Sequence, residues 1–110
     1  MATFDEFQRI DIRVGTVMRA DAFPEARKPA IKMEIDFGAG IGVKRSSAQL
    51  TMHYTPAQLV GRQVMAVVNF PVRRIATLDS EVLVLGALPQ PAEVVLLAVD
   101  HLVPNGTRVG

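Results

Sequence analysis

The sequence predicts an all-β domain, a small antiparallel barrel that carries short helices. Three observations predict it. Apolar and polar residues alternate over long stretches, residues typical of turns separate these stretches, and helix signals are confined to two short segments. The 110 residues fit one domain, 1–110, with no repeats and little room for a second core.

The first element is a short N-terminal helix. Thr3 and Glu6 have the spacing of a capping box, in which each side chain accepts a hydrogen bond from the other residue's backbone N–H. From Ile10 to Ala20, every second residue is apolar except Thr16, and Met18 is part of this series. This period predicts a long strand with one face in water.

A hairpin follows after a proline-containing loop. Residues 31–37 alternate apolar with charged side chains, which predicts a second strand. Three glycines between residues 38 and 42 tolerate positive φ, so residues 43–47 are expected to return antiparallel to that strand.

A second short helix is predicted at residues 55–61, where Thr55 can cap, Pro56 suits the first turn and Gly61 ends the helix. A loop at 71–80 and a turn at 89–91 separate three further strands, 63–70, 81–88 and 94–99. This order fits a five-stranded OB-like barrel with an N-terminal helix, a small inserted helix and extra C-terminal strands.

The late strands are apolar on both faces, over residues 64–68, 82–85 and 94–97. A barrel interior accounts for one face, and the other needs a cover. A second copy of the chain is the more economical cover, and the alternative is a monomer covered by its own helices and C-terminal tail. The candidate dimer-interface residues are Val67, Val82, Val84, Val95 and Leu97.

The composition argues against an enzyme and against metals or cofactors. There is no cysteine, and His53 and His101 are 48 positions apart without a ligand-like spacing. The acidic pairs fall on polar strand faces, and no nucleophile motif occurs. No apolar run approaches the length of a membrane span, and the N-terminus lacks the order of a signal peptide, so we expect a cytoplasmic protein without membrane insertion.

Charge is distributed unevenly, although the net charge is only +1. Residues 37–78 carry five Lys or Arg and no Asp or Glu. Two clusters place adjacent cations beside hydroxyl or amide groups, a combination that suits phosphate and sugar contacts. The alternative is two solvated basic turns. The candidate RNA-binding residues in these clusters are Lys44, Arg45, Ser46, Asn69, Arg73 and Arg74.

Several separated motifs resemble one family. Residues 10–17, 23–26, 69–75 and 80–85 are similar to the tRNA-binding domain found in the C-terminal part of methionyl-tRNA synthetases and in the endothelial-monocyte-activating polypeptide (EMAP II). Within that superfamily, the CsaA-type secretion chaperones show the strongest resemblance. It is carried by residues 37–38, 46–49, 67–71 and 103–107.

The resemblance implies an OB-fold homodimer that binds tRNA-like ligands or, in the CsaA branch, exported preproteins and the export ATPase. The tRNA-contacting positions of the superfamily fall on Asn69, Arg73, Arg74 and Ser80. Val72, Val82 and Leu83 depart from the superfamily pattern, and the branched Val82 stands where relatives keep the backbone accessible. These departures favour the chaperone branch.

The sequence therefore supports a leading hypothesis and an alternative. The leading hypothesis is a non-catalytic homodimeric chaperone that resembles CsaA and binds unfolded exported preproteins for secretion, with peptide-contacting residues that the sequence does not identify. The alternative is a structure-specific tRNA-binding protein that uses the basic surface of residues 44–74.

Overall fold

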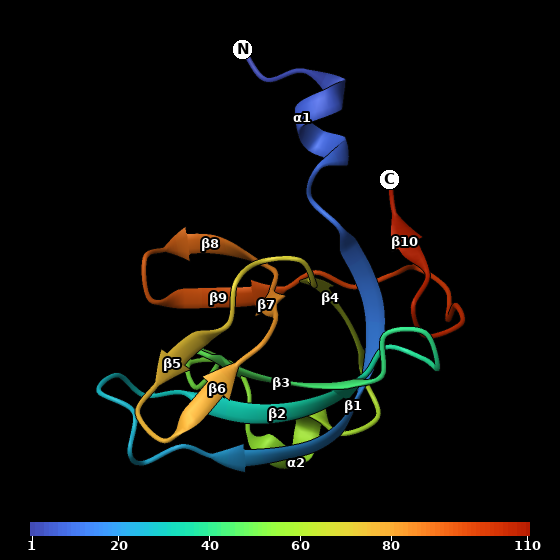
Figure 1. The fold of residues 1–110 in the computed structure, drawn as a ribbon. Helices are drawn as coiled ribbons and strands as arrows, with labels where there is room; N and C mark the ends of the chain where they lie inside the picture. Colours follow the sequence, from blue (N-terminus) through green and yellow to red (C-terminus); the bar gives the residue numbers. More distant parts are fainter.

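A computed structural model describes all residues, 1–110 (Figure 1). Two helices and ten strands follow one another along the chain. They are α1 (Phe4–Gln8), β1 (Ile12–Ala22), β2 (Ile31–Asp36), β3 (Val43–Ala48), α2 (Pro56–Leu59), β4 (Gln63–Val67), β5 (Arg73–Ile75), β6 (Leu78–Ser80), β7 (Leu83–Val84), β8 (Gly86–Gln90), β9 (Glu93–Leu96) and β10 (Arg108–Val109).

The main sheet forms a nearly closed antiparallel barrel, as predicted. Its strand order is β3-β2-β1-β4-β7, and β10 pairs with the start of β1. The barrel closes between β3 and the segment just before β7, where the Glu81 N–H donates to the Arg45 carbonyl at 2.8 Å. Two separate hairpins, β5–β6 and β8–β9, flank this closure. The expected OB-like barrel with short helices is confirmed.

The core follows the period-two pattern of β2. Its apolar side chains and that of Phe37 are buried, and the charged ones between them are only partly so. Leu59 of α2 and Leu50 close one end of the core. The predicted capping box of Thr3 with Glu6 is present, and α2 begins after Thr55, whose N–H donates to the Gln58 side chain at 3.0 Å, with Pro56 in the first turn.

One prediction about β1 is wrong. The strand's register against β2 shifts between Val17 and Arg19, so Met18 is an extra residue in a β-bulge. Val17, which precedes the shift and pairs with the core residue Ile35, is buried, while Met18, which the strict alternation placed on the apolar face with Val14, is 55% exposed. An even spacing of apolar residues contains no information about such an insertion.

The late strands are shorter and more broken than the sequence predicted. The expected strand 81–88 is divided into β7 and β8, and the expected loop 71–80 contains the hairpin β5–β6. Strand β8 also continues through Pro89 to Gln90, where a turn was expected. Strands of two or three residues are too short for a periodic pattern to reveal.

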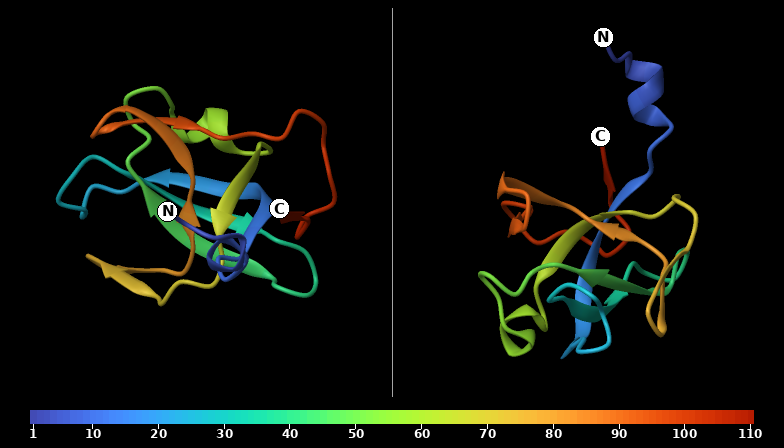
Figure 2. Two further views of the ribbon diagram at one scale, coloured as in Figure 1. Left: turned by 90° about the horizontal axis from the view of Figure 1, so that it is seen from above. Right: turned by 90° about the vertical axis from the view of Figure 1, so that its left-hand side faces the viewer.

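Helix α1 projects away from the barrel, and the two chain ends lie on the same side of the molecule (Figures 1 and 2). None of its residues is buried, and Phe4 is 70% exposed. Neither helix of the structure has the length or the apolar character needed to cross a membrane.

Candidate functional site

A groove of about 880 Å³ lies in the surface between the two hairpins. Aliphatic side chains from β5, β7 and the β8–β9 hairpin form most of its surface. The larger ones are Ile75, Leu83, Val84, Leu85, Leu88 and Val94. No aromatic residue and no Asp or Glu lines the groove. The groove thus offers an apolar surface without acidic groups and without rings for stacking.

Four cations also line this groove, two from the loop before β2 and two from β5. Arg74 forms an ion pair with Asp79 at 2.9 Å. Arg27, Lys28 and Arg73 have no carboxylate within ion-pair distance, and all three are exposed. The groove therefore combines apolar side chains with three unneutralised positive charges.

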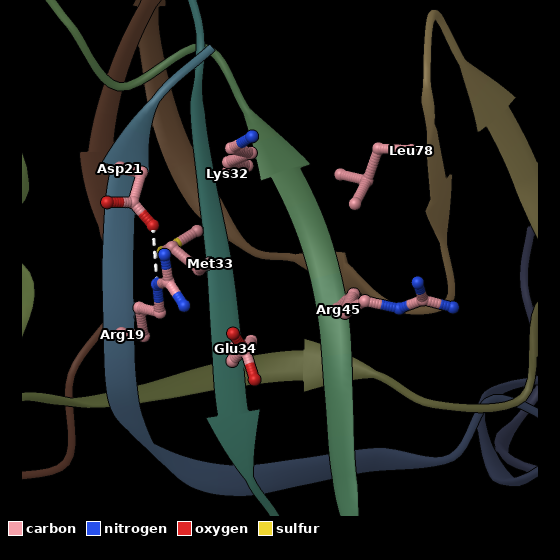
Figure 3. A pocket seen from close by; sticks show the side chains of 7 residues that line it. All are labelled: Arg19, Asp21, Lys32, Met33, Glu34, Arg45 and Leu78. Atoms are coloured by element: carbon pink, nitrogen blue, oxygen red, sulfur yellow. Dashed lines mark hydrogen bonds and ion pairs between the residues drawn. The ribbon is translucent and has the colours of Figure 1, made fainter.

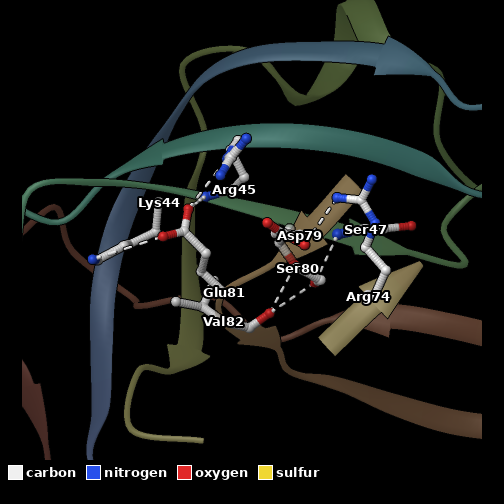
Figure 4. Close-up of polar contacts among 9 residues, drawn as sticks. Lys44, Arg45, Ser47, Arg74, Asp79, Ser80, Glu81 and Val82 are labelled. Carbon is white, nitrogen blue, oxygen red and sulfur yellow. Dashed lines mark hydrogen bonds and ion pairs between the residues drawn. The ribbon is translucent and has the colours of Figure 1, made fainter. Parts of the chain in front are cut away.

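The basic and hydroxyl residues at 44–47 close the barrel (Figure 4). Glu81 accepts a hydrogen bond from the Arg45 guanidinium at 3.3 Å and lies 3.9 Å from the Lys44 ammonium. The Ser80 hydroxyl accepts from the Ser47 N–H at 3.2 Å. The fully buried Ser46 donates its hydroxyl hydrogen to the Val82 carbonyl at 3.0 Å.

Asn69 connects the barrel to the segment that follows α1. Its side-chain oxygen accepts from the Asp11 N–H at 2.9 Å, and its side-chain nitrogen donates to the Arg9 carbonyl at 2.7 Å. Of the seven predicted RNA-binding residues, only Arg73 and Arg74 lie in the groove. The other five are engaged within the chain, and Ser46 and Ser80 are buried.

The β8–β9 hairpin is held against the loop before α2. Glu93, at the start of β9, accepts a hydrogen bond from the His53 ring at 2.6 Å, and the Tyr54 hydroxyl accepts from the Leu96 N–H at 3.0 Å. The hydrogen bond from His53, and then that from Gln90, lower the pKa of Glu93. This hairpin supplies one side of the groove, so these contacts help to fix the groove's width.

A second, smaller hollow of about 230 Å³ lies on the outer face of β1, β2 and β3 (Figure 3). Charges of both signs alternate across it, and Arg19 and Asp21 already pair at 2.8 Å. The hydrogen bond to Asp21 raises the pKa of the Arg19 guanidinium. The mixed charge and small size make this hollow a weaker candidate than the groove.

The predicted dimer-interface residues divide into two groups. Val67, Val82 and Val84 are buried in the chain's own core, so they offer a partner little surface. Val95 and Leu97 are 38% and 39% exposed. Among the residues that line the groove, Arg73, Arg74 and Val84 were candidates from the sequence, but the residues of the loop 26–30 and of β8 were not. The adjacent cations Arg27 and Lys28 were the feature of the sequence that could have indicated this loop as part of a site.

These features define a class: a small OB-fold barrel with a groove in its surface. The matching family model, described as a putative tRNA binding domain, covers residues 12–108. The chain therefore belongs to this tRNA-binding-domain family.

The most informative solved relatives are two chaperones. The chain is 53% identical to chaperone CsaA from Bacillus anthracis, with a TM-score of 0.95, over 100% of this chain and 99% of that one. It is 44% identical to the CsaA chaperone protein from Picrophilus torridus, with a TM-score of 0.92, over the whole of both chains.

The third relative is the methionine–tRNA ligase of Neisseria meningitidis, which is 36% identical over 110 residues and 99% of this chain. The chain spans only 12% to 16% of the length of the methionine–tRNA ligases that it matches.

Proposed function

We propose that the protein is a non-catalytic, homodimeric chaperone that resembles CsaA and binds unfolded exported preproteins in the cytoplasm for secretion. The observation that carries this proposal is the apolar groove between the two hairpins. The full-length similarity to two proteins described as CsaA chaperones supports it. Delivery of the bound preprotein to the export ATPase belongs to the same proposal and rests on the resemblance alone.

The physical basis is burial of a client's apolar side chains. Each Å² of apolar surface removed from water contributes about 25 cal/mol before the cost of ordering the client is subtracted. The groove has few polar side chains that converge on one point, so it selects little among apolar sequences. Binding of this kind is weak and promiscuous, which suits a chaperone that must release its client.

Self-association is supported by apolar side chains that the chain leaves uncovered. Phe4 and Phe7 on α1 are 70% and 40% exposed, and Val95 and Leu97 add a second apolar region. A second copy would cover such residues. Multi-angle light scattering at micromolar concentration is expected to report a dimer of this 12.0 kDa chain. A monomer would remove this part of the proposal.

Titration calorimetry with unfolded preprotein segments tests client binding. The test variant is Leu88→Asp, because Leu88 lies in the groove and is 62% exposed. The control is Leu102→Asp, because Leu102 lies outside the groove and is 84% exposed. Both variants place a carboxylate on the surface, so both are expected to fold. Only Leu88→Asp is expected to weaken binding, by about tenfold for one lost apolar contact. Absence of binding by the wild-type protein at near-millimolar concentration would contradict the proposal.

The second candidate is a tRNA-binding protein, which the family model and the three unpaired cations favour. The engagement of five predicted RNA-binding residues within the chain and the lack of aromatic residues in the groove argue against it. Phosphate contacts release counterions, so tRNA affinity would fall steeply with salt. If the salt slope of tRNA binding is the same in wild type and in Arg73→Ala/Arg74→Ala, these arginines do not contact tRNA.

A further inference from the structure

The edge of β3 that faces away from β2 is hydrogen-bonded to the chain at Arg45, but only in part at Ser47 near the strand's end. In an antiparallel pair, alternate residues direct their backbone groups away from the partner strand. Arg45 does so, because its N–H and carbonyl bond to Glu81, on the side away from β2. By the same alternation, Ser47 directs its backbone groups outward. Gln49 follows the strand directly, in a tight turn in which the Leu50 N–H donates to the Ala48 carbonyl at 2.9 Å.

These outward groups are only partly paired. The Ser47 N–H bonds to the Ser80 hydroxyl, while the Ser47 carbonyl and the Gln49 N–H have no partner within the chain. Both residues are half-buried, and both line the groove. An unpaired backbone acceptor and donor at the edge of a sheet are available for pairing with another extended chain, and here both lie in the groove.

Their spacing matches one partner strand. In a parallel ladder, a single residue donates its N–H to the carbonyl of residue i−1 and accepts from the N–H of residue i+1 of the neighbouring strand. The Ser47 carbonyl and the Gln49 N–H stand in this relation, with Ala48 between them. Glu81 bonds to the same edge of β3 at Arg45, two residues before Ser47.

We propose that the groove holds an extended client segment as an added strand, parallel to the end of β3. One client residue donates its N–H to the Ser47 carbonyl and accepts from the Gln49 N–H. This inference rests on the proposed chaperone function and specifies how the main chain is held. Main-chain bonds exist in every sequence, so they add affinity without restricting the client.

Charge complementarity defines the client further. Arg27, Lys28 and Arg73 line the groove without a carboxylate partner, and no Asp or Glu lines it. The segment is therefore an apolar stretch flanked by acidic side chains, and a basic stretch is disfavoured. The absence of aromatic residues from the groove removes the stacking that single-stranded RNA would need.

The test is a backbone scan of one peptide, acetylated and amidated, with a central Leu-Val-Leu flanked on both sides by Ser and Glu. A series of these peptides carries a single N-methyl group at each position in turn, which removes one N–H donor. Fluorescence anisotropy of labelled peptides is expected to show a loss of about three- to tenfold at one central position and little change at its two neighbours. Equal affinity across the series would overturn the proposal while leaving the chaperone function intact.

Two further comparisons complete the test. Gln49→Pro removes the N–H at residue 49, and Gln49→Ala retains it; Ala48 is extended, as the residue before a proline prefers. Only the proline variant is expected to weaken the peptide. The same peptide with Lys in place of Glu is expected to bind more weakly, and equal or tighter binding would overturn the charge assignment. If wild type binds tRNA and neither peptide, both the inference and the proposed function fail.

Discussion

Replacing Ser46 by alanine tests whether this residue closes the barrel or serves a ligand. Its side chain is fully buried, and its hydroxyl donates to the carbonyl of Val82, which is itself 5% exposed. The variant removes the donor and leaves that carbonyl without a good partner, because the Ser80 hydroxyl is 3.5 Å away. A lost hydrogen bond together with an unpaired buried acceptor costs about 1–3 kcal/mol.

The adjacent residue provides a matched control. The Ser47 hydroxyl makes no hydrogen bond within the chain, since Ser47 acts only through its backbone N–H. Ser47→Ala is therefore expected to change the free energy of unfolding by less than about 0.5 kcal/mol. Urea denaturation followed by far-UV circular dichroism measures both variants at one fixed protein concentration, because self-association would make stability concentration-dependent.

The expected loss of stability in Ser46→Ala can also be measured as a fall in melting temperature. A loss of about 2 kcal/mol corresponds to roughly 8–16 °C in melting temperature for a domain of this size. Equal stability of Ser46→Ala and Ser47→Ala would show that the Ser46 contact does not hold the barrel closed. A loss of tRNA affinity in Ser46→Ala without a loss of stability would assign the hydroxyl to RNA instead.

Three other variants follow from the structure. Gly38 has a φ of +87°, and a Cβ there would lie 2.7 Å from the Asn105 carbonyl oxygen, so Gly38→Ala is expected to unfold at clearly lower urea. Asn69→Ala loses two hydrogen bonds to the N-terminal segment and is expected to show faster amide exchange there, and unchanged exchange would contradict the anchoring role. The His53 hydrogen bond lowers the pKa of Glu93 below its usual 4.5. The stability gained from this shift is present above about pH 4.5 and is lost as pH falls through the lowered pKa, so acid should destabilise wild type more than Glu93→Gln. Identical acid profiles would contradict this.

The fold was predictable where local signals coincide with tertiary structure. The alternation in β2 and the helix starts at Thr3 and Thr55 correspond to observed elements. The bulge at Met18 was not predictable, because the extra residue is accommodated by pairing with β2 and leaves no trace in the local pattern. The division of the late strands also depends on contacts with distant residues, such as that of Leu85 with Met65.

The candidate site was only partly predictable, for a related reason. Adjacent cations indicate a local positive charge, but they do not reveal an acidic partner elsewhere in the fold. Glu81 is 36 residues from Arg45 and accepts its hydrogen bonds. Arg27 and Arg73 are far apart in sequence, yet they line one groove. A ligand-binding surface is assembled by the fold, so the composition of single segments identifies it poorly.

The strands after residue 63 contain more apolar residues than the core can bury, and this excess bears on both the groove and the proposed self-association. A barrel this small buries only 18 of 110 residues, including Val67, Val82 and Val84 from these strands. The fold cannot also cover the opposite faces, so Leu83 and Leu88 remain exposed at the groove and Val95 and Leu97 remain exposed on β9 and just after it. Apolar surface that a domain leaves in water is available to other chains. The dimer contact and the client groove proposed above would therefore both use this uncovered apolar surface, and the hairpin β8–β9 carries residues of each, Val95 of the first and Leu88 of the second.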